Sequence, residues 1–134
     1  MSAQITKSSI DLGIITMQPE AALKFYRDTV GLPLAGEMAM PGGGRMYRLM
    51  AGDSVIKVVH PAAAPSAVAA PGGLQGATGY RYWTITVSNL AELTERCAAA
   101  GYKVPIAPRE IRPGVSISMV EDPDGNWVEF LQMK

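Results

Sequence analysis

The sequence predicts an α+β fold built from two βαβββ units within one chain of 134 residues. Three observations predict this fold. The order of strands and helices expected in residues 8–60 recurs in residues 80–133, after a Pro/Ala/Gly-rich stretch over residues 61–79. Equivalent positions in the two halves differ by 71 or 72 residues, as Asp53 and Asp124 do in matching turns. Such an internal repeat indicates two copies of one unit, neither of which would bury its sheet face alone.

Composition excludes several classes of protein. The 12 basic and 12 acidic residues cancel, so no basic field exists to hold nucleic acid or an anionic membrane. The apolar runs are shorter than the roughly 20 residues of a membrane helix, and the first residues lack the pattern of a signal peptide. The single cysteine, Cys97, excludes an intrachain disulfide and fits a reducing compartment. We therefore expect a cytoplasmic protein with one domain over residues 1–134.

The first unit opens with a strand, which is followed by a helix and three more strands. Pro19 fits the first turn of the helix and Gly31 is placed to end it, with apolar residues at helical spacing between them. Glycine-containing turns separate the later strands. The four strands are expected over residues 10–16, 32–40, 46–50 and 55–59.

Residues 61–79 lack both charge and the periodicity of a helix or strand. We interpret this stretch as a linker. It is either a mobile connector or a surface loop that covers another part of the molecule.

The second unit repeats the order of the first. Asn89 is the expected N-cap of a helix that Gly101 ends. Arg109 and Arg112 are expected in a loop between two strands. The last strand follows the tight turn EDPDG and is mostly apolar, so we expect burial on both faces, which leaves the Glu129 carboxylate in need of a partner. The four strands are expected over residues 80–87, 102–107, 115–120 and 127–131.

Three stretches resemble the vicinal oxygen chelate superfamily, which holds glyoxalase I, extradiol dioxygenases, methylmalonyl-CoA epimerase, and bleomycin- and fosfomycin-resistance proteins. They are EAALKFYRDTVGLPL, VSNLAEL and EDPDGNWVEFLQ, and the resemblance extends over residues 10–132. It implies the glyoxalase/bleomycin-resistance/dioxygenase-like fold, in which curled mixed sheets of two βαβββ modules form an open cup around a small-molecule ligand. It also implies a homodimer.

Metal-binding members of this superfamily place His, Glu, His or Gln, and Glu on the first and last strands of the modules. Carried over by position, these sites fall on Asp11, Lys57, Tyr82 and Glu129, of which only Glu129 matches. A lysine ammonium has no lone pair and would repel a cation. We therefore expect neither a metal nor another cofactor, although Asp11 and Glu129 could still hold an ion together with waters.

The same four residues, which are expected to point into one cup, suggest acid–base chemistry. Glu129 would take a proton next to a carbonyl group, while Lys57 or Tyr82 would stabilise the resulting oxyanion. This predicts a lyase or isomerase type of enzyme that works without a metal. The alternatives are a protein that sequesters a ligand, as resistance proteins of the superfamily do, and a glyoxalase-like or dioxygenase-like metal enzyme. Lys57 could also simply form a structural ion pair with Asp11 or Glu129.

Candidate ligand contacts lie on the strands that should form the cup. Methionine thioethers adapt to flat or irregular apolar ligands, and an arginine can bind a carboxylate or phosphate through two hydrogen bonds. Ordinary core packing and a solvated arginine are the alternatives. The candidates are Arg48, Met46, Met50, Trp83 and Met119.

Overall fold

A computed structural model describes all residues, 1–134. The chain forms eight strands, two α-helices, a π-helical segment (η1) and a short 3-10 helix (η2). Their bounds are β1 (Asp11–Ile15), α1 (Pro19–Leu23), η1 (Lys24–Val30), β2 (Leu34–Ala39), β3 (Gly44–Ala51), β4 (Ser54–Pro61), η2 (Gly73–Gln75), β5 (Tyr82–Thr86), α2 (Leu90–Ala99), β6 (Ile106–Arg112), β7 (Val115–Glu121) and β8 (Trp127–Met133).

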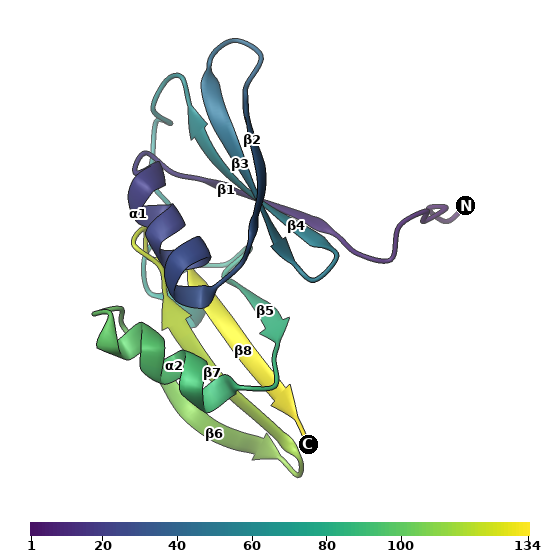
Figure 1. The fold of residues 1–134 in the computed structure, drawn as a ribbon, viewed down its shortest axis with the longest axis vertical. Helices are drawn as coiled ribbons and strands as arrows, with labels where there is room; N and C mark the ends of the chain where they lie inside the picture. Colours follow the sequence, from purple (N-terminus) through teal and green to yellow (C-terminus); the bar gives the residue numbers. More distant parts are fainter.

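The strands form two mixed sheets of four strands each (Figure 1). Sheet A has the order β1-β4-β3-β2, and sheet B has the equivalent order β5-β8-β7-β6. In each sheet the first and last strands of the module run parallel, and the remaining pairs are antiparallel. Neither sheet closes, and β1 and β5 remain unpaired edges. This architecture confirms the predicted α+β fold of two βαβββ modules.

The first helix follows the sequence prediction at both ends. Pro19 occupies its first turn, and Gly31 ends it in the left-handed conformation, with φ of 94°. α1 continues directly into η1. The buried face of this continuous helix includes Phe25 and Tyr26, both fully buried.

The second helix is capped differently from the prediction. Asn89 lies at the N-cap position, but its side chain makes no capping hydrogen bond. The free N–H of Leu90 instead donates to Oε1 of Gln132, at 2.9 Å. Gln132, near the end of β8, therefore caps α2 in place of Asn89, the residue that the sequence predicted as the cap.

Both helices lie on the same side of the two sheets (Figure 1). One cluster of buried apolar side chains runs through both modules, from Ile56 and Val58 of β4 to Val128 and Phe130 of β8. The two modules therefore share a single hydrophobic core, and each sheet has one face packed against it.

Two details of sheet B differ from the prediction. β6 spans Ile106–Arg112, so Arg109 and Arg112 lie on a strand and not in a loop. β8 alternates between buried and partly exposed residues: Phe130 is fully buried, whereas Glu129 is partly exposed. The expectation of burial on both faces was wrong because the helices cover only one face of the sheet.

No helix of the structure combines the length and the apolar character that crossing a membrane requires.

Candidate functional site

Each sheet has a second face, turned away from the shared core, which we call the open face. Successive side chains of a strand point to opposite faces. Since Leu12 and Ile14 pack on the core, Asp11 and Gly13 belong to the open face of sheet A, beside Lys57, which is in register with Gly13. In sheet B the open face carries Tyr82, Thr84 and Glu129.

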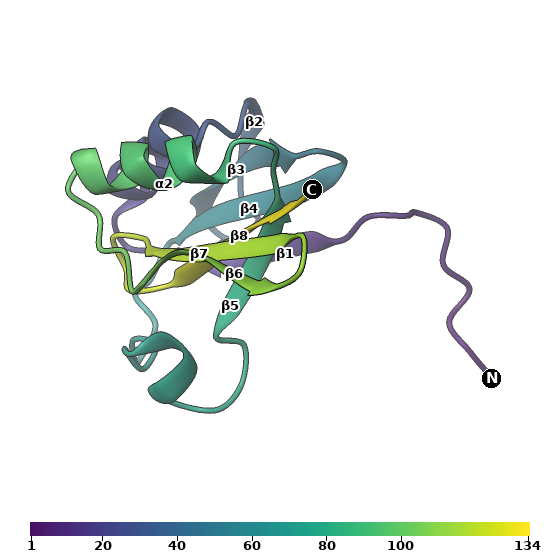
Figure 2. The same ribbon diagram turned by 90° about the horizontal axis from the view of Figure 1, so that it is seen from below.

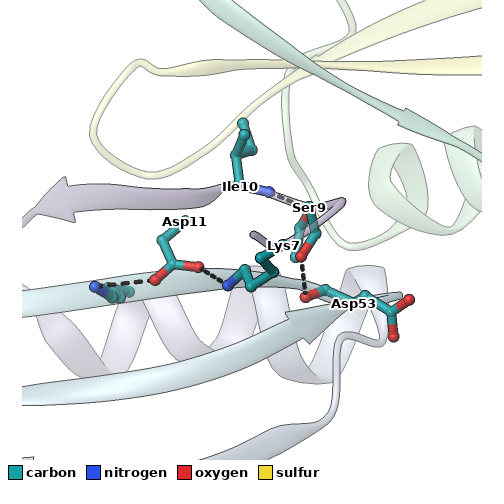
Figure 3. A network of polar contacts seen from close by, with 7 residues as sticks. Lys7, Ser9, Ile10, Asp11 and Asp53 are labelled. Carbon is teal, nitrogen blue, oxygen red and sulfur yellow. Dashed lines mark hydrogen bonds and ion pairs between the residues drawn. The ribbon is translucent and has the colours of Figure 1, made fainter. Parts of the chain in front are cut away.

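Asp11 lies between two lysines (Figure 3). Its carboxylate is 2.6 Å from Nζ of Lys7 and 3.3 Å from Nζ of Lys57. The hydrogen bonds from Lys7 and then from Lys57 lower the pKa of Asp11 below its ordinary value of 3.8. The Asp11 carboxylate is therefore ionised at neutral pH and is a weak base.

Glu129 has a partner on the neighbouring strand. The hydroxyl of Thr84 donates to Oε1 of Glu129 at 2.7 Å. Tyr82, two residues before Thr84, is 48% exposed. The structure thus brings Asp11 together with Lys57, and it places Tyr82 and Glu129 on adjacent strands of sheet B. No hydrogen bond or ion pair joins the first pair to the second.

The side chains at these four positions do not fit the divalent metal that the resemblance implies. The ammonium of Lys57 occupies the position next to Asp11 where a cation would lie. No three His, Cys, Asp or Glu side chains lie close enough together to hold a metal ion. No step of a reaction is therefore assigned to a metal.

A cavity lies between the unpaired edges of β1 and β5. Its volume is about 600 Å³, and 12 of the 18 residues around it are apolar. A volume of this size and an apolar lining are typical of small-molecule sites. One wall is β1 and the turn after it, residues 12–17. The other wall holds four aromatic side chains, Tyr80, Tyr82, Trp83 and Trp127.

The linker forms a third wall of the cavity, through residues 64, 65 and 67–69. It lies on the side of the strands opposite the helices (Figure 2). Arg81 holds it by donating from Nε to the carbonyl oxygen of Gly73 and from Nη2 to that of Ala70, each at 2.7 Å. Gly73 packs on Trp127 so closely that an added Cβ would collide with the indole ring.

The predicted ligand-contact residues fall into three places. Trp83 lines the cavity together with Tyr82, and Nε1 of Trp83 is buried without a hydrogen-bond acceptor. Arg48, Met46 and Met50 lie on the open face of sheet A, in register with Lys57 and its neighbours. Met119 is buried in β7 of sheet B, in register with Glu129 of β8.

Sequence reasoning missed three residues of the cavity. Tyr80 and Trp127 begin or precede strands, where aromatic residues are common and carry no functional signal of their own. Arg81 was missed because its acceptors are main-chain carbonyl groups of a segment without periodicity. The one available signal was the Pro/Ala/Gly-rich composition of that segment, which is typical of a surface loop that could cover a site.

Proteins of known structure share this fold. A search of curated proteins found no match. Among solved structures, a glyoxalase family protein from Bacillus cereus aligns with a TM-score of 0.82 at 15% identity, covering 98% of this chain and 96% of that one. TioX from Micromonospora sp. ML1 aligns with a TM-score of 0.71 at 21% identity, with 96% and 100% covered. The trypanothione-dependent glyoxalase I of Leishmania major gives 0.70 at 18% identity, with 91% and 84% covered.

These identities are low, and the alignments show a shared fold. The family model for the glyoxalase/bleomycin resistance protein/dioxygenase superfamily matches residues 9–130. Because this match spans nearly the whole chain, the protein belongs to the glyoxalase/bleomycin resistance protein/dioxygenase superfamily.

Proposed function

We propose that this protein binds a small organic molecule, whose flat apolar part enters the cavity between β1 and β5. The observation that carries the proposal is the lining of this cavity, where Tyr82 and Trp127 lie side by side on neighbouring strands. Aromatic faces bind flat apolar groups through large contact areas and offset stacking. The anchored linker would shield the bound molecule from water.

The titratable groups favour binding over proton transfer as the primary function. The charge of Asp11 is already balanced by Lys7 and Lys57, and its lowered pKa makes it a poor proton acceptor. The cavity has few polar groups, which would orient a ligand without reacting with it. Sequestration of a ligand, without a metal or another cofactor, is therefore the function that the site supports best.

A second candidate function is the lyase or isomerase chemistry predicted from the sequence, with Glu129 as the base. The observation that favours it is the hydrogen bond from Thr84, which fixes one carboxylate oxygen of Glu129 on the open face and leaves the other free. With a ligand in hand, Glu129→Gln separates the two functions. Loss of turnover with unchanged affinity would indicate catalysis, and an absence of turnover in the native protein would indicate binding alone.

We also propose a homodimer that works in a reducing compartment such as the cytoplasm. Exposed apolar side chains in β2 and just before β1, including Ile10, Leu34 and Met38, would gain from being covered by a second copy. The lone buried thiol, Cys97, fits a reducing compartment. Sedimentation equilibrium tests the dimer, and a monomer at micromolar concentration would contradict it.

The binding proposal can be tested with N-phenyl-1-naphthylamine, a neutral aromatic probe that fluoresces in apolar sites. We expect the native protein to bind it, and we expect Tyr82→Ala to weaken the affinity about tenfold through the lost aromatic contact. Tyr82 is exposed and makes no side-chain hydrogen bond, so this change leaves folding intact. Ile111→Ala, an equally exposed position on β6 away from the cavity, is the matched control. Absence of binding, or equal binding by both variants, would overturn the proposal.

A further inference from the structure

We propose that Arg48 and Lys57 form an anion subsite next to the cavity, so that the ligand is an organic anion with a flat apolar body. This inference rests on the proposed function, because the cavity must hold the body of the ligand. The oxyanion, a carboxylate or a sulfonate, would lie over the open face of sheet A.

The register of sheet A places the two cations beside the cavity. Gly13, Lys57, Arg48 and Gly36 are in register across β1, β4, β3 and β2. Gly13 also lines the cavity. Since neighbouring strands are about 4.8 Å apart, Lys57 lies about 5 Å and Arg48 about 10 Å from the cavity wall at the level of the backbone. This span matches a ligand with one or two rings and a terminal anion.

The glycines at the two ends of this row leave room for a ligand. An added Cβ at Gly13 or at Gly36 would meet no atom within 4 Å. Neither glycine has a positive φ, so the backbone conformation does not require glycine at these positions. The missing side chains leave open space at both ends of the row, and Gly13 at one end is also a lining residue of the cavity.

The charge near this row is positive. Arg48 is half-buried and makes no hydrogen bond or ion pair with any other residue of the chain. Lys57 and Lys7 share one carboxylate, that of Asp11. Three cations therefore face one acid, and the planar guanidinium of Arg48 has free N–H groups that match the two oxygens of a carboxylate or sulfonate.

Apolar side chains border the cations. Met46 and Met50 lie on either side of Arg48 along β3, on the same face. They displace water from the surroundings of an incoming anion, and charge–charge attraction is stronger where water is excluded. Their flexible thioethers also adapt to different ring systems.

A pair of probes tests the subsite directly. 8-Anilinonaphthalene-1-sulfonate has the same rings as N-phenyl-1-naphthylamine and differs from it by one sulfonate. We expect the native protein to bind the sulfonate probe at least about tenfold more tightly, since hydrogen bonds to a charged group contribute more than this factor requires. Added salt should weaken binding of the sulfonate probe alone.

Substitutions then assign the effect to Arg48. We expect Arg48→Gln to remove about tenfold of the affinity for the sulfonate probe and to leave the neutral probe unaffected, while Arg48→Lys should retain part of the difference. Arg45→Gln is the matched control, because Arg45 lies on the same strand but on the opposite face, near Glu37. It should change neither affinity.

The outcomes separate this inference from the proposed function. If both probes bind with equal affinity, or if Arg48→Gln leaves the affinity for the sulfonate probe unchanged, the subsite is wrong and the cavity stands. If neither probe binds, the proposed function fails and the subsite fails with it.

Discussion

At the scale of single residues, the best-satisfied polar group is the carboxylate of Asp122, which is buried in the turn before β8. It accepts hydrogen bonds from the hydroxyl of Tyr26 at 2.6 Å and from the Asn126 amide group at 2.9 Å, and also from the main-chain N–H groups of residues 124 and 126. Tyr26 belongs to the first module and Asp122 to the second. This bond therefore joins the two modules in the interior.

We predict that Tyr26→Phe lowers the free energy of unfolding by about 1.5–3 kcal/mol, the range for a buried hydrogen bond to a charged group. Urea unfolding at neutral pH measures this change. Tyr47→Phe, at a tyrosine whose hydroxyl makes no hydrogen bond within the chain, is the control and should change stability little. Equal stability of the two variants would show that the Tyr26 bond contributes nothing.

The same pair makes stability depend on pH in a predictable direction. Burial raises the pKa of Asp122 above 3.8, and the hydrogen bond from Tyr26 opposes this rise. The folded protein therefore holds the proton more tightly than the unfolded chain, so this group's contribution to stability falls as the pH rises from 3.8 through the folded pKa. Tyr26→Phe should raise that pKa further. We expect a larger loss of stability at about pH 7 than at about pH 4, and a pH-independent loss would contradict this.

Sequence reasoning at this scale predicted which residues lie near one another better than it predicted their individual contacts. The ligand positions carried over from the superfamily placed Asp11 and Lys57 together, and they form the ion pair that was one of the alternatives. Sequence reasoning did not predict that Lys7 would also bind Asp11, or that Thr84 would hold Glu129. These contacts depend on side-chain rotamers, on which the repeat imposes no constraint.

At the scale of elements, the linker depends on one side chain. Arg81 donates to the main chain of residues 70, 71 and 73. We predict that Arg81→Ala releases the linker, which should weaken binding of N-phenyl-1-naphthylamine several-fold and speed proteolytic cleavage within residues 61–79. Arg27→Ala is the control, since Arg27 pairs only with its neighbour Asp28 on the surface. An unchanged cleavage rate would mean that Arg81 does not hold the linker.

The cap of α2 provides a second prediction for an element. Because Gln132 and not Asn89 caps Leu90, we expect Gln132→Ala to cost about 1 kcal/mol of stability and Asn89→Ala to cost much less. Thermal unfolding of the two variants checks this order. If Asn89→Ala instead cost more stability than Gln132→Ala, Asn89 would be the cap of α2, as the sequence predicts.

At the scale of the whole molecule, the sequence predicted the fold class because the order of elements occurs twice and each element has clear end signals. The site was harder to predict. The cavity lies between β1 and β5, whose edges stay unpaired. Strand periodicity indicates which face of a strand is buried, but not how far two sheets stand apart. The third wall of the cavity is the linker, which lacks the periodicity of a helix or strand. Its position over Trp127 could therefore be seen only in three dimensions.

The shared core carries a last prediction, that the two modules unfold as one unit. Phe25 packs edge-on against Tyr102 of the second module, with ring centroids 4.7 Å apart. Arg96 of α2 donates to the carbonyl oxygen of Thr29. Separating the modules would expose these contacts and much of the common core, which makes a half-folded state costly.

Two spectroscopic signals can test this cooperativity. Both tryptophans, Trp83 and Trp127, belong to the second module, so their fluorescence reports mainly on that module, whereas far-UV circular dichroism reports on both. We expect the two signals to give the same urea midpoint, and Tyr26→Phe, a change in the first module, should shift both midpoints equally. A fluorescence transition that occurs apart from the circular dichroism transition, or that does not move in Tyr26→Phe, would mean that the modules fold independently. The cavity between β1 and β5 would then lie between two separately folding parts, and its shape would depend on their docking.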